Sequence, residues 1–199
     1  MLISEELLFS YGAETITCKR GEIIFNEGDL PTHYYQISQG RIKLNHFKED
    51  GSELILAILP VGLSVCELLL FIDEKYPVNA VTLESSQIIK LSKSEFLKML
   101  DEHVQVAKDV NKFLAERLYH KFIMLENNAS LQPEARILGV LEYYKSFLMG
   151  NREKYSFIVP LTRQQLASMT GLRVETVIRT IKNIEKQDQL KIVSGKIHY

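Results

Sequence analysis

One segment near the C-terminus, residues 161–187, constrains the fold of this chain more than any other. Thr162 can cap a short helix, and Gln165, three residues later, completes a capping box. Gly171 follows that helix, at a point where a tight turn can require a positive φ. A second helix is indicated by one apolar stripe with spacings of four and three residues, formed by Val177, Ile181 and Ile184. Two short helices joined by a glycine turn are typical of the helix-turn-helix, whose second helix enters the DNA major groove.

The rest of the second helix carries side chains that suit base recognition. Glu175, Ile178 and Arg179 lie at i, i+3 and i+4, so they share a face. Arg179 can bond guanine O6 and N7, and Glu175 can accept from cytosine N4. Lys182, one turn further on, can meet a phosphate. The full set of candidate DNA contacts is Thr162, Arg163, Arg173, Val174, Glu175, Thr176, Ile178, Arg179 and Lys182.

A solvated helix with an internal ion pair between Glu175 and Arg179 is the simpler interpretation of those two residues alone. The capping box, the glycine and the buried stripe together favour DNA binding instead. Residues 161–167, 170–172 and 175–179 resemble the Crp–Fnr family of bacterial transcription regulators, and a weaker similarity extends over nearly the whole chain. The resemblance implies that Glu175 and Arg179 read a half-site with a TGA-like core. It also implies contacts with RNA polymerase.

The charge of the chain is distributed unevenly. The net charge is −1, but residues 130–199 hold 11 Lys and Arg against 6 Asp and Glu, a net +5. The remainder holds 13 basic and 19 acidic residues, a net −6. A basic C-terminal third on an acidic body is the pattern expected of a DNA-binding module, although a chance imbalance in a small domain is the alternative.

Several other classes of protein have little support in the sequence. No run approaches the roughly 18 apolar residues of a membrane span, and the first residues lack the basic segment of a signal peptide. Cys18 and Cys66, the two cysteines, suit a reducing cytosol, so we expect a cytoplasmic protein. The five histidines are scattered, so we expect no metal, haem or iron–sulfur cluster, including the cluster of some family members. The absence of a nucleophile elbow, a P-loop and HExxH predicts that the chain is not an enzyme.

The N-terminal part, residues 1–98, reads as a β-domain. Ser4 can cap a short first helix, and Asp50-Gly51 is a hairpin turn signal. Several short apolar segments separated by turn signals suggest a β-sandwich or barrel. Residues 21–22, 28–29, 35–37 and Gly40 are similar to the opening strands of the cyclic-nucleotide-binding jelly roll, with a generic β-domain as the alternative. The expected strands are residues 23–25, 34–37, 42–44, 54–59, 80–83 and 88–91.

The effector pocket is where this chain departs from the family. Cyclic-nucleotide binders of the family hold the ribose with a glycine-glutamate pair, which is Cys66-Glu67 here, and the cyclic phosphate with an arginine and a hydroxyl residue, where this chain has residues 76–79. A cyclic phosphate buried without a cation is poorly compensated, so we expect no cyclic AMP binding of the usual kind. Glu67 either faces another small molecule or bonds backbone amides, and Cys66 is a core residue rather than a redox sensor. The candidate pocket residues are Cys66, Glu67, Pro77, Val78, Lys121 and Phe122.

A long helix is expected to connect the two parts, over residues 99–128. Ser92 and Glu95 make a capping box before its first segment, and a longer helix runs from about His103 to Glu126. Its apolar residues cover more than one face, so either it is buried against its own domain or it also pairs with a second copy. A two-fold dimer would place two recognition helices about 34 Å apart, which predicts a palindromic site. The expected dimer seam is Ala107, Val110, Leu114, Leu118 and Leu125.

The C-terminal module, residues 129–199, is predicted to be a winged helix. Residues 127–130 form the hinge, and a helix runs from Pro133 to Gly150-Asn151. A strand is expected at residues 155–160 and a two-stranded wing at residues 190–193 and 196–199. Lys191 and Lys196 can contact phosphates or be solvated edge residues.

The predicted fold is therefore α+β: a jelly-roll sensor domain (1–98), a dimerisation helix and hinge (99–128), and a winged helix-turn-helix (129–199). The leading hypothesis is a homodimeric transcription regulator that binds palindromic DNA. One alternative is a small-molecule sensor that acts through protein contacts only. The other is a jelly-roll enzyme such as a cupin, which the scattered His33 and His46 argue against.

Overall fold

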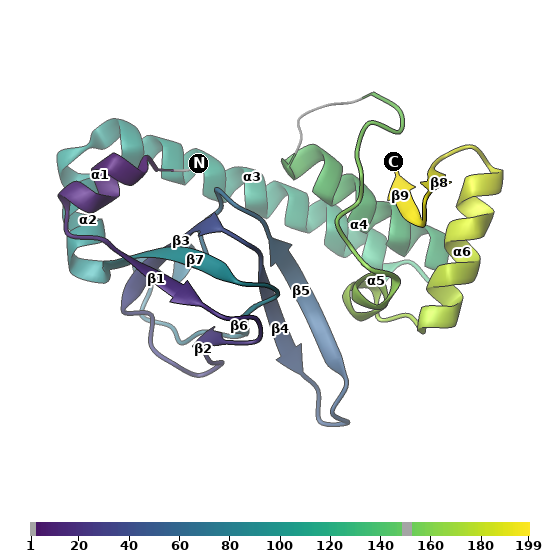
Figure 1. The fold of residues 1–199 in the computed structure, drawn as a ribbon, viewed down its shortest axis with the longest axis horizontal. Helices are drawn as coiled ribbons and strands as arrows, with labels where there is room; N and C mark the ends of the chain where they lie inside the picture. The colour runs from purple at the N-terminus through teal and green to yellow at the C-terminus, as the bar shows by residue number, and fades with distance from the viewer. Residues whose placement is uncertain (1–2, 149–152) are drawn as a thin grey trace. The chain divides into compact units, whose positions relative to one another are not determined.

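The chain forms two compact units, Met1–Leu114 and Ala115–Tyr199 (Figure 1). The computed structural model describes residues 3–148 and 153–199. The boundary between the units falls inside the long helix α3 (Val104–Ala129). The first turns of this helix pack on the core of the N-terminal unit, through Val106, Ala107 and Val110. The contacts therefore divide the helix, whereas the sequence predicts it as a separate part.

The N-terminal unit is built on two antiparallel sheets, with strand orders β1-β7-β3 and β2-β6-β4-β5. Their inner faces form one apolar core, in which Ile37, Ile42, Ala80 and Ile88 are fully buried. The strands are β1 (Glu14–Cys18), β2 (Ile23–Phe25), β3 (His33–Gln39), β4 (Ile42–Phe47), β5 (Glu53–Leu59), β6 (Asn79–Thr82) and β7 (Ser86–Ser92). All six predicted strands are confirmed, and their ends differ from the prediction by at most three residues. The sequence analysis missed β1, which has one buried residue and so a weak apolar pattern.

The hairpin between β4 and β5 has the turn that the sequence predicts. Gly51 has a φ of 77°, and its N–H donates to the Lys48 carbonyl at 2.9 Å. The N–H of Lys48 donates to the Ser52 carbonyl at 2.9 Å, and the Asp50 carboxylate accepts from the Ser52 N–H at 2.9 Å. Glycine adopts this left-handed conformation without the steric cost of a side chain. The local chemistry of Asp50-Gly51 therefore sets the register of the two longest paired strands of this sheet.

Besides the first turns of α3, the N-terminal unit contains the helical elements α1, α2 and η1. In α1 (Glu5–Ser10), Ser4 caps the helix by accepting the Leu7 N–H, as predicted. In α2 (Lys93–Glu102), Ser92 accepts the Glu95 N–H at 3.3 Å. The capping box predicted there is only half formed, because the Glu95 carboxylate lies 3.8 Å from Lys98 Nζ instead. The third element is a 3-10 helix, η1 (Glu67–Phe71).

The predicted hinge begins too early. The helix α3 continues through residues 127–129, and the chain leaves helical geometry at residues 130–132. Asn127 donates its side-chain N–H to the Ile123 carbonyl at 2.9 Å and lies against Gly139, where an added Cβ would be 2.4 Å from that of Asn127. This close approach between two helices packs Asn127 within helical structure, although asparagine usually favours a break.

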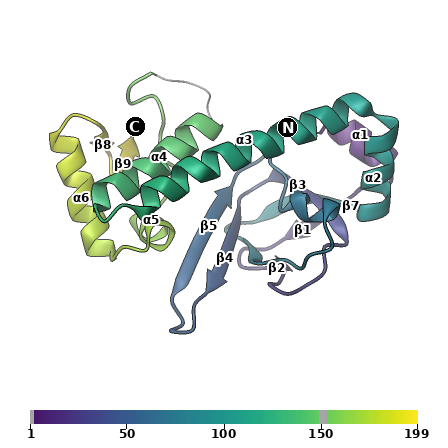
Figure 2. The same ribbon diagram turned by 180° about the vertical axis from the view of Figure 1, so that it is seen from behind.

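The C-terminal unit contains the second half of α3, three further helices and a hairpin, and α4, α5 and α6 contact one another (Figure 2). Pro133 occupies the first turn of α4, as predicted, and Ile137, Val140 and Leu141 of that helix are fully buried. The predicted end of this helix, Gly150-Asn151, lies outside the described residues. The elements are α4 (Pro133–Leu148), α5 (Arg163–Thr170), α6 (Val174–Lys186), β8 (Lys191–Val193) and β9 (Lys196–His198).

The strand predicted at residues 155–160 is wrong. The segment is extended and makes one isolated bridge, between Ile158 and His198. Phe157 and Tyr199 exchange two backbone hydrogen bonds at 2.9 and 3.2 Å, and the Val159 N–H donates to the Ile197 carbonyl at 2.9 Å. The segment thus pairs with β9, but it begins from a turn in which Tyr155 has a φ of 62°, which shortens the ladder.

Candidate DNA-binding interface

The capping box at the start of α5 is complete. The Thr162 hydroxyl accepts the Gln165 N–H at 3.1 Å, and the Gln165 side-chain carbonyl accepts the Thr162 N–H at 2.8 Å. Gly171 ends the helix with a φ of 67°, and nothing lies within 4 Å of the position of an added Cβ. The glycine is therefore needed for its backbone conformation and not for space. These local signals define the short helix and the turn that leads into α6.

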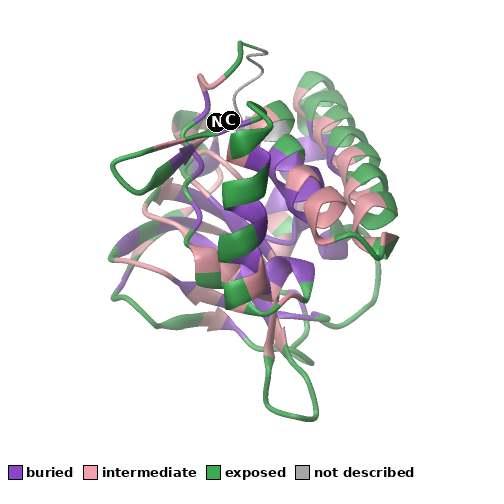
Figure 3. Ribbon diagram, turned by 90° about the vertical axis from the view of Figure 1, so that its right-hand side faces the viewer, coloured by how far each residue is buried: buried purple, intermediate pink, exposed green. Residues whose placement is uncertain are grey.

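The buried stripe of α6 fixes its orientation within the C-terminal unit. Val177, Ile181 and Ile184 are each no more than 1% exposed. Burying three such side chains contributes roughly 1.5–3 kcal/mol each, which is enough to set which face of the helix points outward. Figure 3 shows α6 with its inner face buried and its outer face exposed. The prediction of the stripe is confirmed by this burial.

The outer face of α6 carries the side chains proposed to read bases. Glu175, Ile178, Arg179 and Lys182 are all exposed. They line one shallow hollow along the helix together with Asn183 and Lys186. Within residues 3–148 and 153–199, Glu175 and Arg179 form no ion pair with each other. The described structure therefore lacks the internal ion pair that the simpler interpretation requires.

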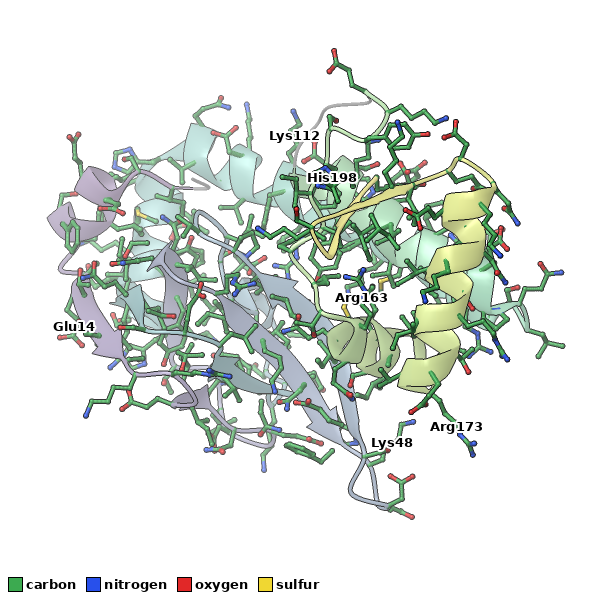
Figure 4. All side chains as sticks on the ribbon, turned by 45° about the vertical axis from the view of Figure 1, so that its right-hand side comes forward. Glu14, Lys48, Lys112, Arg163, Arg173 and His198 are labelled. Atoms are coloured by element: carbon green, nitrogen blue, oxygen red, sulfur yellow. The ribbon has the colours of Figure 1, made fainter. Side chains whose placement is uncertain are left out.

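The remaining candidate contacts flank this face. Arg173, which precedes α6, is exposed and points away from the protein (Figure 4), while Val174 and Thr176 are half-buried. Arg173 occupies the N-cap position but makes no side-chain cap, so the first amides of α6 have no side-chain acceptor there. Thr162 is exposed with its hydroxyl in the capping box, and Arg163 is half-buried. All nine residues come from the helix-turn-helix and its caps.

Comparison with known proteins identifies both parts of the chain. Residues 15–103 match the cyclic nucleotide-binding domain, and residues 135–198 match the Crp-like helix-turn-helix domain. The chain belongs to the Crp–Fnr family. It is a DNA-binding transcription regulator, and proteins of this family are not enzymes.

Two relatives and one solved structure illustrate the similarity. The nitrogen fixation regulation protein FixK of Bradyrhizobium diazoefficiens is 23% identical over 193 residues, which cover 95% of this chain and 79% of FixK. The cyclic AMP receptor protein of Thermus thermophilus is 23% identical over 178 residues, covering 89% and 80%. The structure of FixK2 from Bradyrhizobium japonicum matches with a TM-score of 0.74 at 18% identity, covering 94% of this chain and 91% of FixK2. At that identity, the likeness to FixK2 shows the fold alone.

The candidate effector residues of this Crp–Fnr regulator come from both units. Cys66 and Val78 are buried in the sandwich core, at 7% and 4% exposure, and Glu67 is buried at 1%. Pro77 is exposed. Lys121 and Phe122 belong to the C-terminal unit, and Phe122 is 60% exposed.

Cys66 occupies an unusual backbone position. It has a φ of 55°, in the left-handed region that glycine adopts without cost, and a non-glycine residue there costs about 1–2 kcal/mol. The family pattern has glycine at this place, so the structure gives a backbone reason for that preference. Burial, followed by the charge of Glu67, raises the pKa of the Tyr34 hydroxyl well above its ordinary value. Glu67 is thus a buried residue, at 1% exposure, whose charge acts on Tyr34.

A cavity of about 520 Å³ lies elsewhere in the N-terminal unit, beside η1, α2 and the first turns of α3. Its lining is mostly apolar, with two polar side chains, Asp101 and Asn111. Three residues of the expected dimer seam, Ala107, Val110 and Leu114, also line it. None of the six candidate effector residues does.

The five residues of the expected seam differ in exposure. Val110 is 1% exposed and belongs to the core of its own unit, against which the half-buried Ala107 and Leu114 also pack. Leu118 and Leu125 are 56% and 67% exposed. Phe122, at 60%, lies between them with spacings of four and three residues. The second half of α3 therefore exposes an apolar row, Leu118, Phe122 and Leu125, which we call the α3 row.

The sequence analysis missed a surface cluster that ties the segment before α5 to the end of α6. Lys154 Nζ lies 2.7 Å from the Asp188 carboxylate, and the Tyr155 hydroxyl donates to the Asp188 carbonyl at 2.7 Å. The ammonium groups of Lys154 and Lys191 lie 4.8 and 4.4 Å from the centre of the Tyr155 ring. The hydrogen bond from Lys154 lowers the pKa of the Asp188 carboxyl. Lys191 therefore has a ring partner, which no spacing in the sequence indicates.

Neither a metal site nor a membrane-spanning helix is found in the described part of the chain. No group of three or more His, Cys, Asp or Glu side chains among residues 3–148 and 153–199 could hold a metal ion. Among the helices that the structure describes, none is long and apolar enough to cross a bilayer.

Proposed function

We propose that this regulator binds a palindromic operator as a homodimer, through α6, and that cyclic AMP does not control it in the family's usual way. The single observation that carries the first part is the outer face of α6. An acid and a base one turn apart, Glu175 and Arg179, are exposed and unpaired with each other, while the opposite stripe is buried. That arrangement leaves both side chains available for base edges.

The roles on the DNA follow from donor and acceptor chemistry. Arg179 donates two hydrogen bonds to O6 and N7 of a guanine, and Glu175 accepts from N4 of a cytosine. Lys182, one turn further along α6, neutralises a phosphate, and the uncapped amides at the start of the helix donate hydrogen bonds to another. Resemblance to the family suggests a half-site with a TGA-like core. The remaining candidates, Arg163 and Arg173 among them, position the protein on the backbone.

Dimer formation is supported by the α3 row. Leu118, Phe122 and Leu125 form an apolar stripe that is 56–67% exposed in the described part of the single chain. A seam with spacings of four and three residues is typical of paired helices. Ala107, Val110 and Leu114 extend the predicted seam along the first half of α3, although Val110 is buried within its own unit. Two-fold pairing places two copies of α6 on successive major grooves, which requires a palindromic operator.

The proposal on cyclic AMP concerns the sandwich. Tyr76 stacks on Phe25 with ring centres 3.6 Å apart, and Val78 is buried, so two of residues 76–79 are core residues. No arginine or lysine is present among these four residues, where the family places the cation that holds the cyclic phosphate. One relative is named as a cyclic AMP receptor. The cyclic nucleotide-binding domain suggests a small-molecule effector for this chain, of other chemistry. By family, we further propose a cytoplasmic location and contacts with RNA polymerase.

Selection of bound fragments from random DNA tests the proposal, followed by titration of the selected site. We expect a palindrome, and we expect Arg179→Ala to lose at least about tenfold in affinity for it, since one good bidentate pair contributes roughly 1–3 kcal/mol per half-site. Arg20→Ala is the matched control, because it removes the same charge from an exposed position in the other unit. Enrichment of no palindrome, or equal losses in the two variants, contradicts the proposal. Calorimetry with cyclic AMP should detect no binding at millimolar concentration.

A further inference from the structure

Ile178 differs in kind from its neighbours on the outer face of α6. It is 42% exposed, whereas the other isoleucines of the helix, Ile181 and Ile184, are no more than 1% exposed. The other residues of the hollow, Glu175, Arg179, Lys182, Asn183 and Lys186, are polar or charged. A single exposed apolar side chain is ordinary on a protein surface. This one lies between the two side chains proposed to read bases, so its chemistry bears on what the helix can recognise.

The major groove offers one kind of apolar group on its base edges, the C5 methyl of thymine. An isoleucine has no donor or acceptor for the other edges. Cytosine at the same place would lack the methyl and would leave its N4 donor against an apolar side chain, which is unfavourable. A β-branched side chain in a helix also has one strongly preferred rotamer, so Ile178 presents its methyl groups at little entropic cost. The exposed isoleucine is therefore suited to select thymine.

We propose that Ile178 recognises the methyl group of a thymine within two base pairs of the pair bound by Glu175 and Arg179. The proposal rests on the proposed function, because it requires α6 in the major groove. The position follows from geometry. Glu175, Ile178 and Arg179 span about one helical turn, roughly 5.4 Å, and successive bases are roughly 3.4 Å apart. Ile178 thus adds a thymine requirement beside the charged pair.

Replacing each thymine of the selected operator by uracil, one symmetric pair at a time, removes the methyl and leaves every hydrogen-bonding group in place. The affinity of the wild type for the operator should fall when one particular thymine is replaced. We expect a loss of about fourfold per half-site, and about fifteenfold when both half-sites carry uracil, because each missing methyl removes the stabilisation of about one buried CH₂ group. Ile178→Ala should bind the thymine and uracil operators equally. Ile158→Ala is the matched control, since it makes the same substitution at an isoleucine that is 49% exposed in the same unit. It should retain the wild-type sensitivity to uracil.

The outcomes separate this inference from the function on which it rests. If the protein prefers the selected operator over random DNA but binds thymine and uracil sites equally at every position, the inference is overturned and the proposed function stands. If Ile178→Ala keeps the full sensitivity to uracil, another residue contacts the methyl and the inference is again overturned. A protein without any preference for the selected operator overturns both. Loss of sensitivity in Ile178→Ala alone supports the assignment.

Discussion

Replacing Thr162 by alanine removes one half of the capping box that begins α5. The hydroxyl accepts the Gln165 N–H at 3.1 Å in the native chain, and alanine leaves that amide to water. The helix has only eight residues, Arg163–Thr170, and a helix this short is not stable in isolation, so its ends matter to the whole unit. Loss of an N-cap threonine costs about 1 kcal/mol. For a unit of this size, that corresponds to a fall in Tm of about 4–8 °C.

The reciprocal bond predicts a second, crossed effect. The Gln165 side chain accepts the Thr162 N–H at 2.8 Å, so Gln165→Ala exposes the amide of the other partner. Native-state hydrogen exchange resolves the two amides. We expect Thr162→Ala to accelerate exchange at the Gln165 amide and Gln165→Ala to accelerate exchange at the Thr162 amide. Each variant should leave the exchange of the deeply buried Val140 and Leu141 amides in α4 almost unchanged until the unit unfolds globally.

Thr162→Ser is the control, because serine keeps the accepting oxygen and is an equally good cap. It should retain native stability within a few tenths of a kcal/mol and native exchange at Gln165. Measuring stability without DNA separates capping from any direct contact that Thr162 makes with an operator. If alanine and serine at position 162 gave the same Tm, the capping box would not support α5, and the reasoning would be refuted.

Two further predictions concern the other unit and the dimer. Changing both Leu118 and Leu125 to Glu should weaken dimerisation by about 100-fold, because each change replaces an apolar contact of roughly 1.5 kcal/mol between the two copies by a pair of like charges. Sedimentation measures the dimer affinity. Leu131→Glu is the control that should stay dimeric, since Leu131 lies outside α3 and is 92% exposed. A monomeric wild type would contradict it. The hydrogen bond from Arg41 lowers the pKa of Glu84 below its ordinary 4.5, so its stabilisation is present above pH 4.5 and is lost as pH falls through the lowered value. Glu84→Gln should therefore lower the free energy of unfolding at pH 7 but not at pH 3, by no more than about 1 kcal/mol because the half-buried pair is still screened by solvent. Equal losses at both pH values in urea titrations would argue against the pair.

The parts of the fold that the sequence predicts correctly are those set by short-range rules. The Thr162 capping box, the Gly171 turn and the α6 stripe each depend on residues within one or two turns of each other. The same holds for the Asp50-Gly51 hairpin, whose φ is a property of glycine. Six strands were predicted from apolar runs. The strand β1 was missed because it has one buried residue and forms through its pairing with β7.

Two of the errors have their physical origin in contacts between residues that are distant in sequence. An asparagine pair that favours a break stays helical because Asn127 fits against Gly139 of another helix. The segment 155–160 makes only one bridge because its start is bound to Asp188, more than thirty residues away. The half-formed capping box of α2 has a local origin instead, because Glu95 has two partners three residues away, Ser92 and Lys98, and its carboxylate lies near Lys98.

For the recognition surface, the sequence by itself determined which residues are available: the periodicity that buries Val177, Ile181 and Ile184 leaves Glu175, Ile178 and Arg179 on the remaining arc of the helix. Only the tertiary structure decided that Glu175 and Arg179 do not bond each other, that Val110 belongs to the core of its own unit, and that Leu118 and Leu125 remain exposed. The physical reason is that helical periodicity is a local property of the chain. Which apolar face finds a partner depends on the packing of elements that are far apart in sequence.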